Sequence, residues 1–135
     1  MRRKKSKGEM EWRRAPDIKK RLASIVKTVE MDWIKTSRLF VYRSYNSTAR
    51  AYARTWGFPR VWQMSLREKP AYVIEVLSEQ FDKLPISEQD KVLVHELAHI
   101  PKNFSGSLLA HIKKRGSRNF HNRVEQLIGS LFRNK

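Results

Sequence analysis

The stretch VLVHELAHIP, residues 92–101, holds two of the chain's four histidines four positions apart, with a glutamate directly after the first. Positions i and i+4 of a helix lie on one face, so the imidazoles of His95 and His99 can hold one Zn²⁺ together. Glu96 then lies beside the metal and can take a proton from its water. A single helical histidine is usually an ordinary surface or core residue, but this pair with its glutamate predicts a metal site.

The residues on either side of the motif predict that it lies on a helix over residues 88–100. Ser87 can cap the start of this helix, and Asp90 three residues later completes an approximate capping box. Pro101 ends it, because a residue before proline is pushed out of the helical region. The apolar positions that we expect to pack in the core are Val92, Leu93, Val94, Leu97 and Ile100.

A catalytic zinc site uses three protein ligands and leaves a fourth position open. The candidates for the third ligand are His111, His121 and Glu125. The metzincin spacing is excluded, because Lys102 and Ser105 stand where that pattern has glycine and histidine. His111 follows a short segment that can return the chain to the metal, whereas Glu125 would match the glutamate that gluzincins carry on a second helix. We favour His111 and keep the other two as alternatives.

The motif and the residues after it resemble a known family. The stretch over residues 92–101, followed by Phe104-Ser105-Gly106, His111 and residues 120–127, is similar to the zincin-like metallopeptidases of archaea and phages. These are small proteins distantly similar to SprT-like metallopeptidases. The resemblance is specific over about residues 91–127 and loose upstream.

This resemblance implies Zn²⁺ as the cofactor, held by His95, His99 and His111, with Glu96 as the general base. SprT-like proteins usually carry glycine directly after the third histidine, whereas Ile112 stands here. The implied fold is α+β: a minimal zincin-like domain in which a small mixed β-sheet packs on the HExxH helix, with N- and C-terminal helices.

Periodicity over the rest of the chain predicts the order helix, strands, metal helix and closing helix, which matches such a domain. Apolar stripes at helical spacing predict helices over residues 16–29 and 119–132. Residues 46–55 could be a short helix or a structured loop. Alternating or β-branched runs predict strands over residues 38–44, 60–66 and 71–77. Either of the last two strands could be the edge along which an extended substrate lies.

Length and composition indicate a single domain without a membrane span. A chain of 135 residues, 40% hydrophobic, can bury one core. No apolar run approaches the roughly 18 residues of a membrane span, and the basic N-terminus lacks the apolar stretch of a signal peptide. The absence of cysteine excludes disulfides and suits a cytoplasmic protein. We expect a flexible basic arm over residues 1–14 and one metallopeptidase domain over residues 15–135.

The net charge of +16 is concentrated at the two ends of the chain. Residues 1–21 hold ten Lys/Arg against three Asp/Glu, and residues 102–135 hold eight against one, so each end carries +7. Residues 22–101, which contain the motif, carry only +2. Basic ends are typical of proteins that bind polyanions, so nucleic acid or ribonucleoprotein is a second predicted partner beside a peptide or protein substrate.

The preferred hypothesis is a zinc-dependent metallopeptidase, which the basic ends could direct to nucleoprotein substrates. The competing hypothesis is a nucleic-acid- or ribonucleoprotein-associated binding protein on the same scaffold, with a structural metal or none. A third and weaker reading is a metal-dependent hydrolase of a non-peptide bond, because the motif alone does not determine the substrate.

Overall fold

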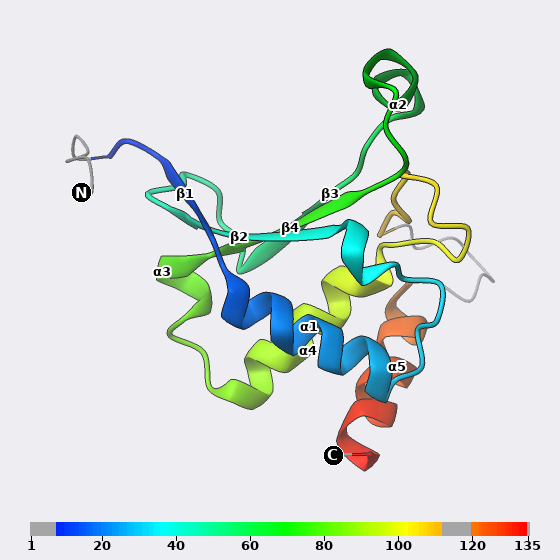
Figure 1. Cartoon of the computed structure of the whole chain (residues 1–135). Coiled ribbons are helices and arrows are strands. Elements are labelled where there is room, and N and C mark those ends of the chain that lie inside the picture. Colours follow the sequence, from blue (N-terminus) through cyan, green and yellow to red (C-terminus); the bar gives the residue numbers. More distant parts are fainter. Residues whose placement is uncertain (1–7, 112–119, 135) are drawn as a thin grey trace.

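The computed structural model describes residues 8–111 and 120–134, whose arrangement is shown in Figure 1. Within these residues the strands are β1 (Glu11–Arg14), β2 (Leu39–Tyr45), β3 (Ala53–Trp56) and β4 (Tyr72–Leu77). The helices are α1 (Pro16–Thr28), α2 (Arg60–Leu66), α3 (Ser78–Phe81), α4 (Ile86–Ala98) and α5 (Phe120–Arg133). A short 3-10 turn, η1 (Thr36–Arg38), precedes β2.

The sheet is mixed and has the strand order β1-β2-β4-β3. β2 and β4 run parallel in its centre, whereas β1 and β3 pair antiparallel at its edges. The helices α1, α4 and α5 cover one face, and α2 projects beyond the end of the sheet (Figure 1). This arrangement confirms the predicted α+β fold, with a small mixed sheet packed on the motif helix as in small zincin-like domains.

The hydrophobic core lies between the sheet and these helices. Alternate side chains of the central strands face the helices, among them Val41, Ile74 and Val76, which are at most 6% exposed. From the helical layer, Leu22 of α1 and Leu97 of α4 are completely buried. Burial of one such side chain contributes about 1.5–3 kcal/mol, so apolar packing holds the motif helix against the sheet.

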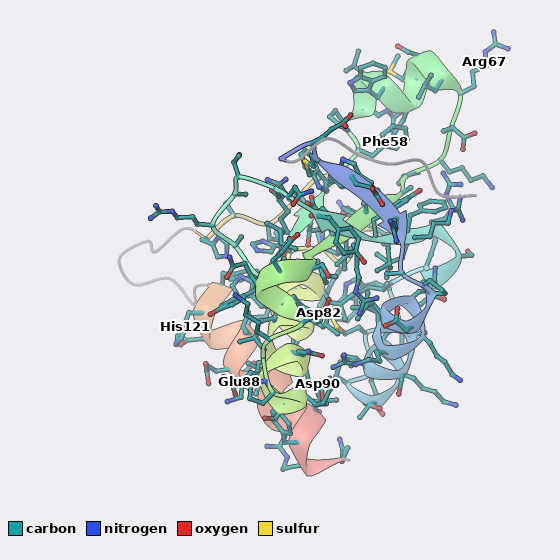
Figure 2. All side chains as sticks on the ribbon, turned by 90° about the vertical axis from the view of Figure 1, so that its left-hand side faces the viewer. Phe58, Arg67, Asp82, Glu88, Asp90 and His121 are labelled. Atoms are coloured by element: carbon teal, nitrogen blue, oxygen red, sulfur yellow. The ribbon has the colours of Figure 1, made fainter. Side chains whose placement is uncertain are left out.

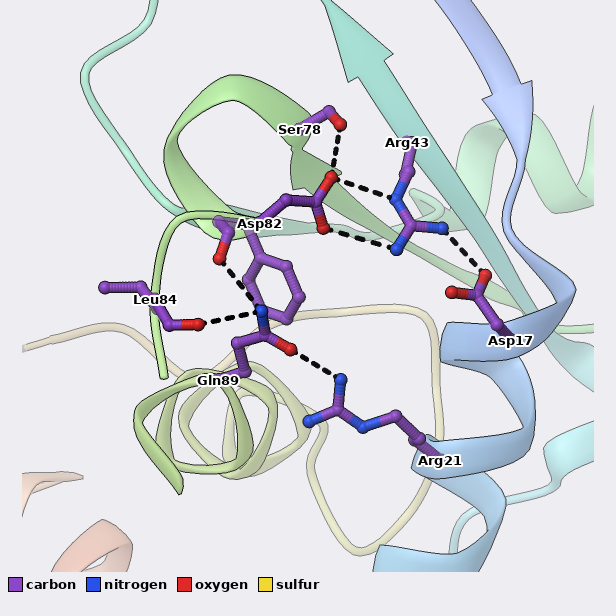
Figure 3. Close-up of polar contacts among 8 residues, drawn as sticks. Asp17, Arg21, Arg43, Ser78, Asp82, Leu84 and Gln89 are labelled. Carbon is purple, nitrogen blue, oxygen red and sulfur yellow. Dashed lines mark hydrogen bonds and ion pairs between the residues drawn. The ribbon is translucent and has the colours of Figure 1, made fainter. Parts of the chain in front are cut away.

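A cluster of polar contacts joins α1, β2 and the start of α4 (Figure 3). Arg43 of β2 lies between Asp17 of α1, at 2.7 Å, and Asp82 just after α3, at 3.3 Å. The hydrogen bond from Arg43 holds the pKa of Asp17 below its ordinary value. Arg21 of α1 donates to the side-chain oxygen of Gln89 in α4 at 2.7 Å. These contacts set the orientation of α4 and therefore the direction in which its motif points.

The motif helix begins earlier than predicted, and Ser87 does not cap it. Pro85 is the N-cap residue, and no side chain caps the helix. Asp90, which we expected to complete a capping box, is only 4% exposed and pairs with Arg21 at 2.7 Å. The Asp90 side chain is therefore used in an ion pair with Arg21 of α1, and not in the expected capping box with Ser87. The helix ends at Ala98, before Pro101 as predicted.

Residues 60–66, predicted as a strand, form the helix α2 instead. Alternation indicates a strand only when one face of the segment is buried against the core. In α2 only Gln63 is buried, and the apolar side chains point outward. The alternation of apolar residues in this segment therefore did not indicate a strand of the sheet.

The prediction for residues 46–55 missed a strand, since Ala53–Trp56 forms β3. β3 is the edge strand beside α4, because it pairs only with β4 in the described part of the chain. Residues 71–77, the remaining edge candidate, correspond to the central strand β4. The four residues of β3 are too few for periodicity to distinguish them from a loop.

The N-terminal boundary also differs from the prediction. Residues Glu11–Arg14, expected to belong to a flexible arm, form β1 and pair with β2. Trp12 of β1 packs edge-on against Tyr42 at 6.5 Å between ring centroids, which fastens the strand to the sheet. Residues 1–7 of the predicted arm lie outside the described residues. None of the helices in the described ranges has the length and apolar character needed to cross a membrane.

Candidate metal centre

Three imidazoles converge at the C-terminal end of α4. His95 lies in the last turn, and His99 follows as the C-cap residue with a right-handed helical backbone. The ligand nitrogens of His95, His99 and His111 all lie within 4.8 Å of one another, and Nε2 of His95 is 2.7 Å from Nε2 of His111. Over residues 8–111 and 120–134, no other group of potential ligands converges in this way. Three imidazole nitrogens suit a divalent transition metal.

His111 reaches this cluster because residues 101–110 fold back across the end of α4. The Leu109 N–H donates to the carbonyl oxygen of His99 at 2.8 Å, and Nδ1 of His99 lies 2.5 Å from the Leu109 carbonyl oxygen. A bond through Nδ1 leaves Nε2 of His99 free to face a metal. Gly106 makes the turn with a φ of +98°, and a Cβ there would lie 2.3 Å from the carbonyl oxygen of Phe58.

Burial keeps the motif imidazoles neutral. Desolvation, together with the charges of the other two imidazoles, lowers the pKa of His95 to about 4. Desolvation also lowers the pKa of His99, although the hydrogen bond with Leu109 opposes the change. A neutral imidazole offers a lone pair to a metal, so His95 and His99 are in the ligating form at neutral pH.

Glu96 is 7% exposed and lies beside the cluster. Burial raises the pKa of its carboxyl group to about 7, while a hydrogen bond from the Thr55 hydroxyl, at 2.9 Å, opposes the rise. A carboxyl group with a pKa near neutrality can both accept and return a proton. No local sequence pattern marks Thr55 for this role, because its partner Glu96 is 41 residues away.

A cavity of about 520 Å³ opens beside the cluster, between α4 and α5. His95, Glu96 and His111 lie in its wall. Both alternative ligands, His121 and Glu125, also line it from α5, but they lie outside the group of converging histidines. Figure 2 shows His121 near the start of α5. Much of the remaining wall is apolar and includes Tyr52, Leu84, Val92, Val124 and Ile128.

Phe120, the first residue of α5, packs against all three imidazoles. It stacks on His99 with 4.3 Å between ring centroids and meets His95 and His111 edge-on at 5.0 and 4.9 Å. The ring closes one side of the cluster and restricts rotation of the imidazoles. Phe120 belongs to the segment that carried the family resemblance, yet no sequence pattern assigned it to the metal site.

The family model described as "Putative phage metallopeptidase" matches residues 10–129, a range that includes the histidine cluster and Glu96. No curated protein and no solved structure matches the chain. The family match supports the phage-type part of the predicted resemblance, whereas the distant similarity to SprT-like metallopeptidases stays a prediction.

Proposed function

The chain belongs to the putative phage metallopeptidase family, and from this premise we propose that it is a zinc-dependent peptidase. Membership of the family implies a metal and a peptide or protein substrate. The identity of the metal and the role of each residue are our proposal. The observation that carries it is the convergence of His95, His99 and His111 beside the buried Glu96.

The three histidines would provide the three protein ligands of a catalytic zinc site, with the fourth position open. When bound there, zinc supplies Lewis-acid polarisation of the scissile carbonyl and lowers the pKa of a water molecule. The donor set is compatible with zinc, because imidazole nitrogens are common zinc ligands.

Glu96 would carry the proton between the two halves of the reaction. Its carboxylate accepts a proton from the attacking water, and the carboxyl group then returns this proton to the leaving amine nitrogen as the C–N bond breaks. Thr55 acts as a positioning residue, because its hydroxyl lies 2.9 Å from Oε1 of Glu96. The raised pKa of the buried carboxyl group supports this exchange of roles.

The substrate would approach along β3. In the described part of the chain β3 pairs only with β4, so an extended peptide can add to its outer edge through main-chain hydrogen bonds. The contact between Thr55 and Glu96 brings this strand next to the catalytic carboxylate. The largely apolar cavity between α4 and α5 could accept an apolar side chain beside the scissile bond.

Metal analysis of the purified protein tests the proposal. We expect about one zinc per chain in the wild type and little in His95→Ala, His99→Ala and His111→Ala. His121→Ala is the matched control, since it removes a histidine from the same cavity but should keep the metal. A wild type without zinc, or ligand variants that hold zinc as well as the wild type, would contradict the site.

A second candidate function is nucleic-acid binding, and the outer face of the sheet favours it. Trp12 and Trp56 are 44% and 45% exposed there, with 6.4 Å between ring centroids. The Arg54 guanidinium lies 5.0 Å from the centre of the Trp56 ring, and Arg14 is exposed on β1. Aromatic rings beside arginines can stack on the bases of a single strand.

This face could bind nucleic acid whether the metal is catalytic, structural or absent, so the two functions are tested separately. We expect single-stranded DNA and RNA to bind at low salt, with affinity falling as salt rises. Trp12→Ala and Trp56→Ala should weaken this binding. A wild type that binds neither polymer at low salt would exclude this second function.

A further inference from the structure

Helix α2 exposes most of its apolar surface. Val61, Trp62, Met64 and Leu66, four of its seven residues, are between 55% and 67% exposed, and we call them the α2 patch. Figure 1 shows that α2 projects beyond the end of the sheet, and Figure 2 places Phe58 toward its base and Arg67 at its outer end. Large apolar side chains gathered in the open usually mark an interaction surface.

The base of α2 is fixed to the segment that carries the third histidine. Gln63 is 5% exposed, and its amide donates to the carbonyl oxygens of Phe58 and Ser105 at 2.7 and 2.8 Å. The Phe58 N–H donates to the carbonyl oxygen of Gly106 at 2.7 Å. From there the chain continues to His111. The α2 patch is therefore held in a defined place relative to the histidine cluster.

The α2 patch also continues the open edge of β3. β3 ends at Trp56 and α2 begins at Arg60, four positions further along the chain, so at most about 14 Å separates the two residues. Thr55 of β3 contacts Glu96. A polypeptide that paired with β3 near Glu96 and continued past Trp56 would reach the α2 patch after roughly four more residues.

We propose that the α2 patch binds an apolar segment of an extended protein substrate, several residues away from the scissile bond. This inference rests on the proposed peptidase function and specifies its substrate class, which is unfolded or extended polypeptides rather than short peptides. Arg60, Arg67 and Lys69 are exposed around the patch, so acidic residues beside the apolar segment would complement it.

Kinetics with a long and a short substrate test the docking site. The double variant Trp62→Ser/Met64→Ser changes two exposed side chains and should fold normally. We expect its KM for labelled casein, an unfolded acidic protein, to rise about tenfold. Its kcat for casein and its kcat/KM for a short fluorogenic peptide should stay unchanged. Ile86→Ser is the matched control, because Ile86 is 63% exposed but lies at the start of α4.

Binding without turnover separates this inference from the proposed function. In a Glu96→Gln background, the α2 double variant should bind labelled casein about tenfold more weakly by fluorescence anisotropy. Equal affinities would overturn the docking site even if the wild type cleaves casein. Weaker binding by a protein whose wild type cleaves nothing would uphold the docking site and overturn the peptidase. A wild-type dimer that the α2 variant dissociates in sedimentation velocity would instead assign the patch to self-association.

Discussion

Glu96 combines two opposing influences on one carboxyl group. Burial raises its pKa to about 7, and the Thr55 hydroxyl stabilises the charged form from the neighbouring strand. The balance leaves a carboxyl group that exchanges protons near neutrality, within the same end of α4 as His95 and His99. The pKa of this single carboxyl group therefore depends on both the helix α4 and the edge strand β3.

Replacing Glu96 with glutamine should separate metal binding from catalysis. The amide keeps the size of the side chain but cannot accept the proton of the attacking water, so we expect kcat to fall about 10²- to 10⁴-fold. The zinc content should stay at the wild-type level. Glu125→Gln, which alters a carboxylate in the same cavity wall, should keep both properties. Undiminished cleavage by Glu96→Gln would remove Glu96 from the mechanism.

Removing the Thr55 hydroxyl should reduce the rate without removing the metal. In Thr55→Val the buried Glu96 carboxylate loses the hydrogen bond from the Thr55 hydroxyl, a loss that costs about 1–3 kcal/mol for a buried polar group. We expect kcat to fall about tenfold at an unchanged zinc content and KM. Thr55→Ser restores a hydroxyl and should recover most of the rate. If Thr55→Ser is as slow as Thr55→Val, the hydroxyl is not the cause.

Among the elements, β3 is joined to β4 by an ion pair that lies on the outer face of the sheet. Glu75 of β4 is completely buried, although this face carries none of the three packed helices. Arg54 of β3, its cross-strand partner, holds both carboxylate oxygens at 2.7 and 3.3 Å. The Trp56 indole N–H donates to the same carboxylate at 2.9 Å. The edge strand that carries Thr55 thus depends on a buried charge.

This ion pair predicts a dependence of stability on pH. Burial raises the pKa of Glu75, but the hydrogen bonds from Arg54 and Trp56, together with the charge of Arg54, oppose this rise, and the pKa lies below its ordinary value of 4.5. A lowered folded-state pKa contributes stability above pH 4.5, and the contribution is lost as the pH falls through the folded value. Glu75→Gln should therefore be less stable at neutral pH, by about 2 kcal/mol.

Urea unfolding at several pH values measures this effect. The difference between the wild type and Glu75→Gln should shrink as the pH falls below 4.5. Glu68→Gln is the control, because it breaks an exposed ion pair with Arg38 that contributes at most about 1 kcal/mol. A difference that stays constant down to low pH would mean that the charge of Glu75 does not stabilise the sheet.

At the scale of the whole molecule, a deletion that tests the role of the basic N-terminus must leave the strand β1 in place. Residues 1–7 hold five Lys/Arg, whereas residues 11–14 form an edge strand of the sheet. Deleting residues 1–7 should weaken single-stranded DNA binding about tenfold at low salt and reduce its salt dependence. Peptide cleavage and thermal stability should stay unchanged. Unaltered DNA binding would show that these residues do not contact nucleic acid.

The longer deletion of residues 1–14 is the informative comparison. It also removes β1 and exposes the edge of β2, so it should lower the melting temperature as well as the affinity. If both deletions leave stability unchanged, β1 does not contribute to the fold.

The sequence by itself determined the features that depend only on residues close together in one helix or strand. His95, Glu96 and His99 share an end of one helix because of their spacing, and the apolar stripes of α1 and α5 marked those helices nearly to their ends. The return of His111 toward the motif helix was the favoured alternative, and the structure places this histidine in the cluster.

Only the tertiary structure decided which distant residues meet. Thr55 contacts Glu96, and Phe120 packs on the imidazoles, because separate elements are pressed together around one core. The same packing replaced the expected Ser87 cap with an ion pair to Asp90 and left α2 outside the core. Periodicity reports which side of an element is apolar, but it contains no information about which partner, if any, covers that side.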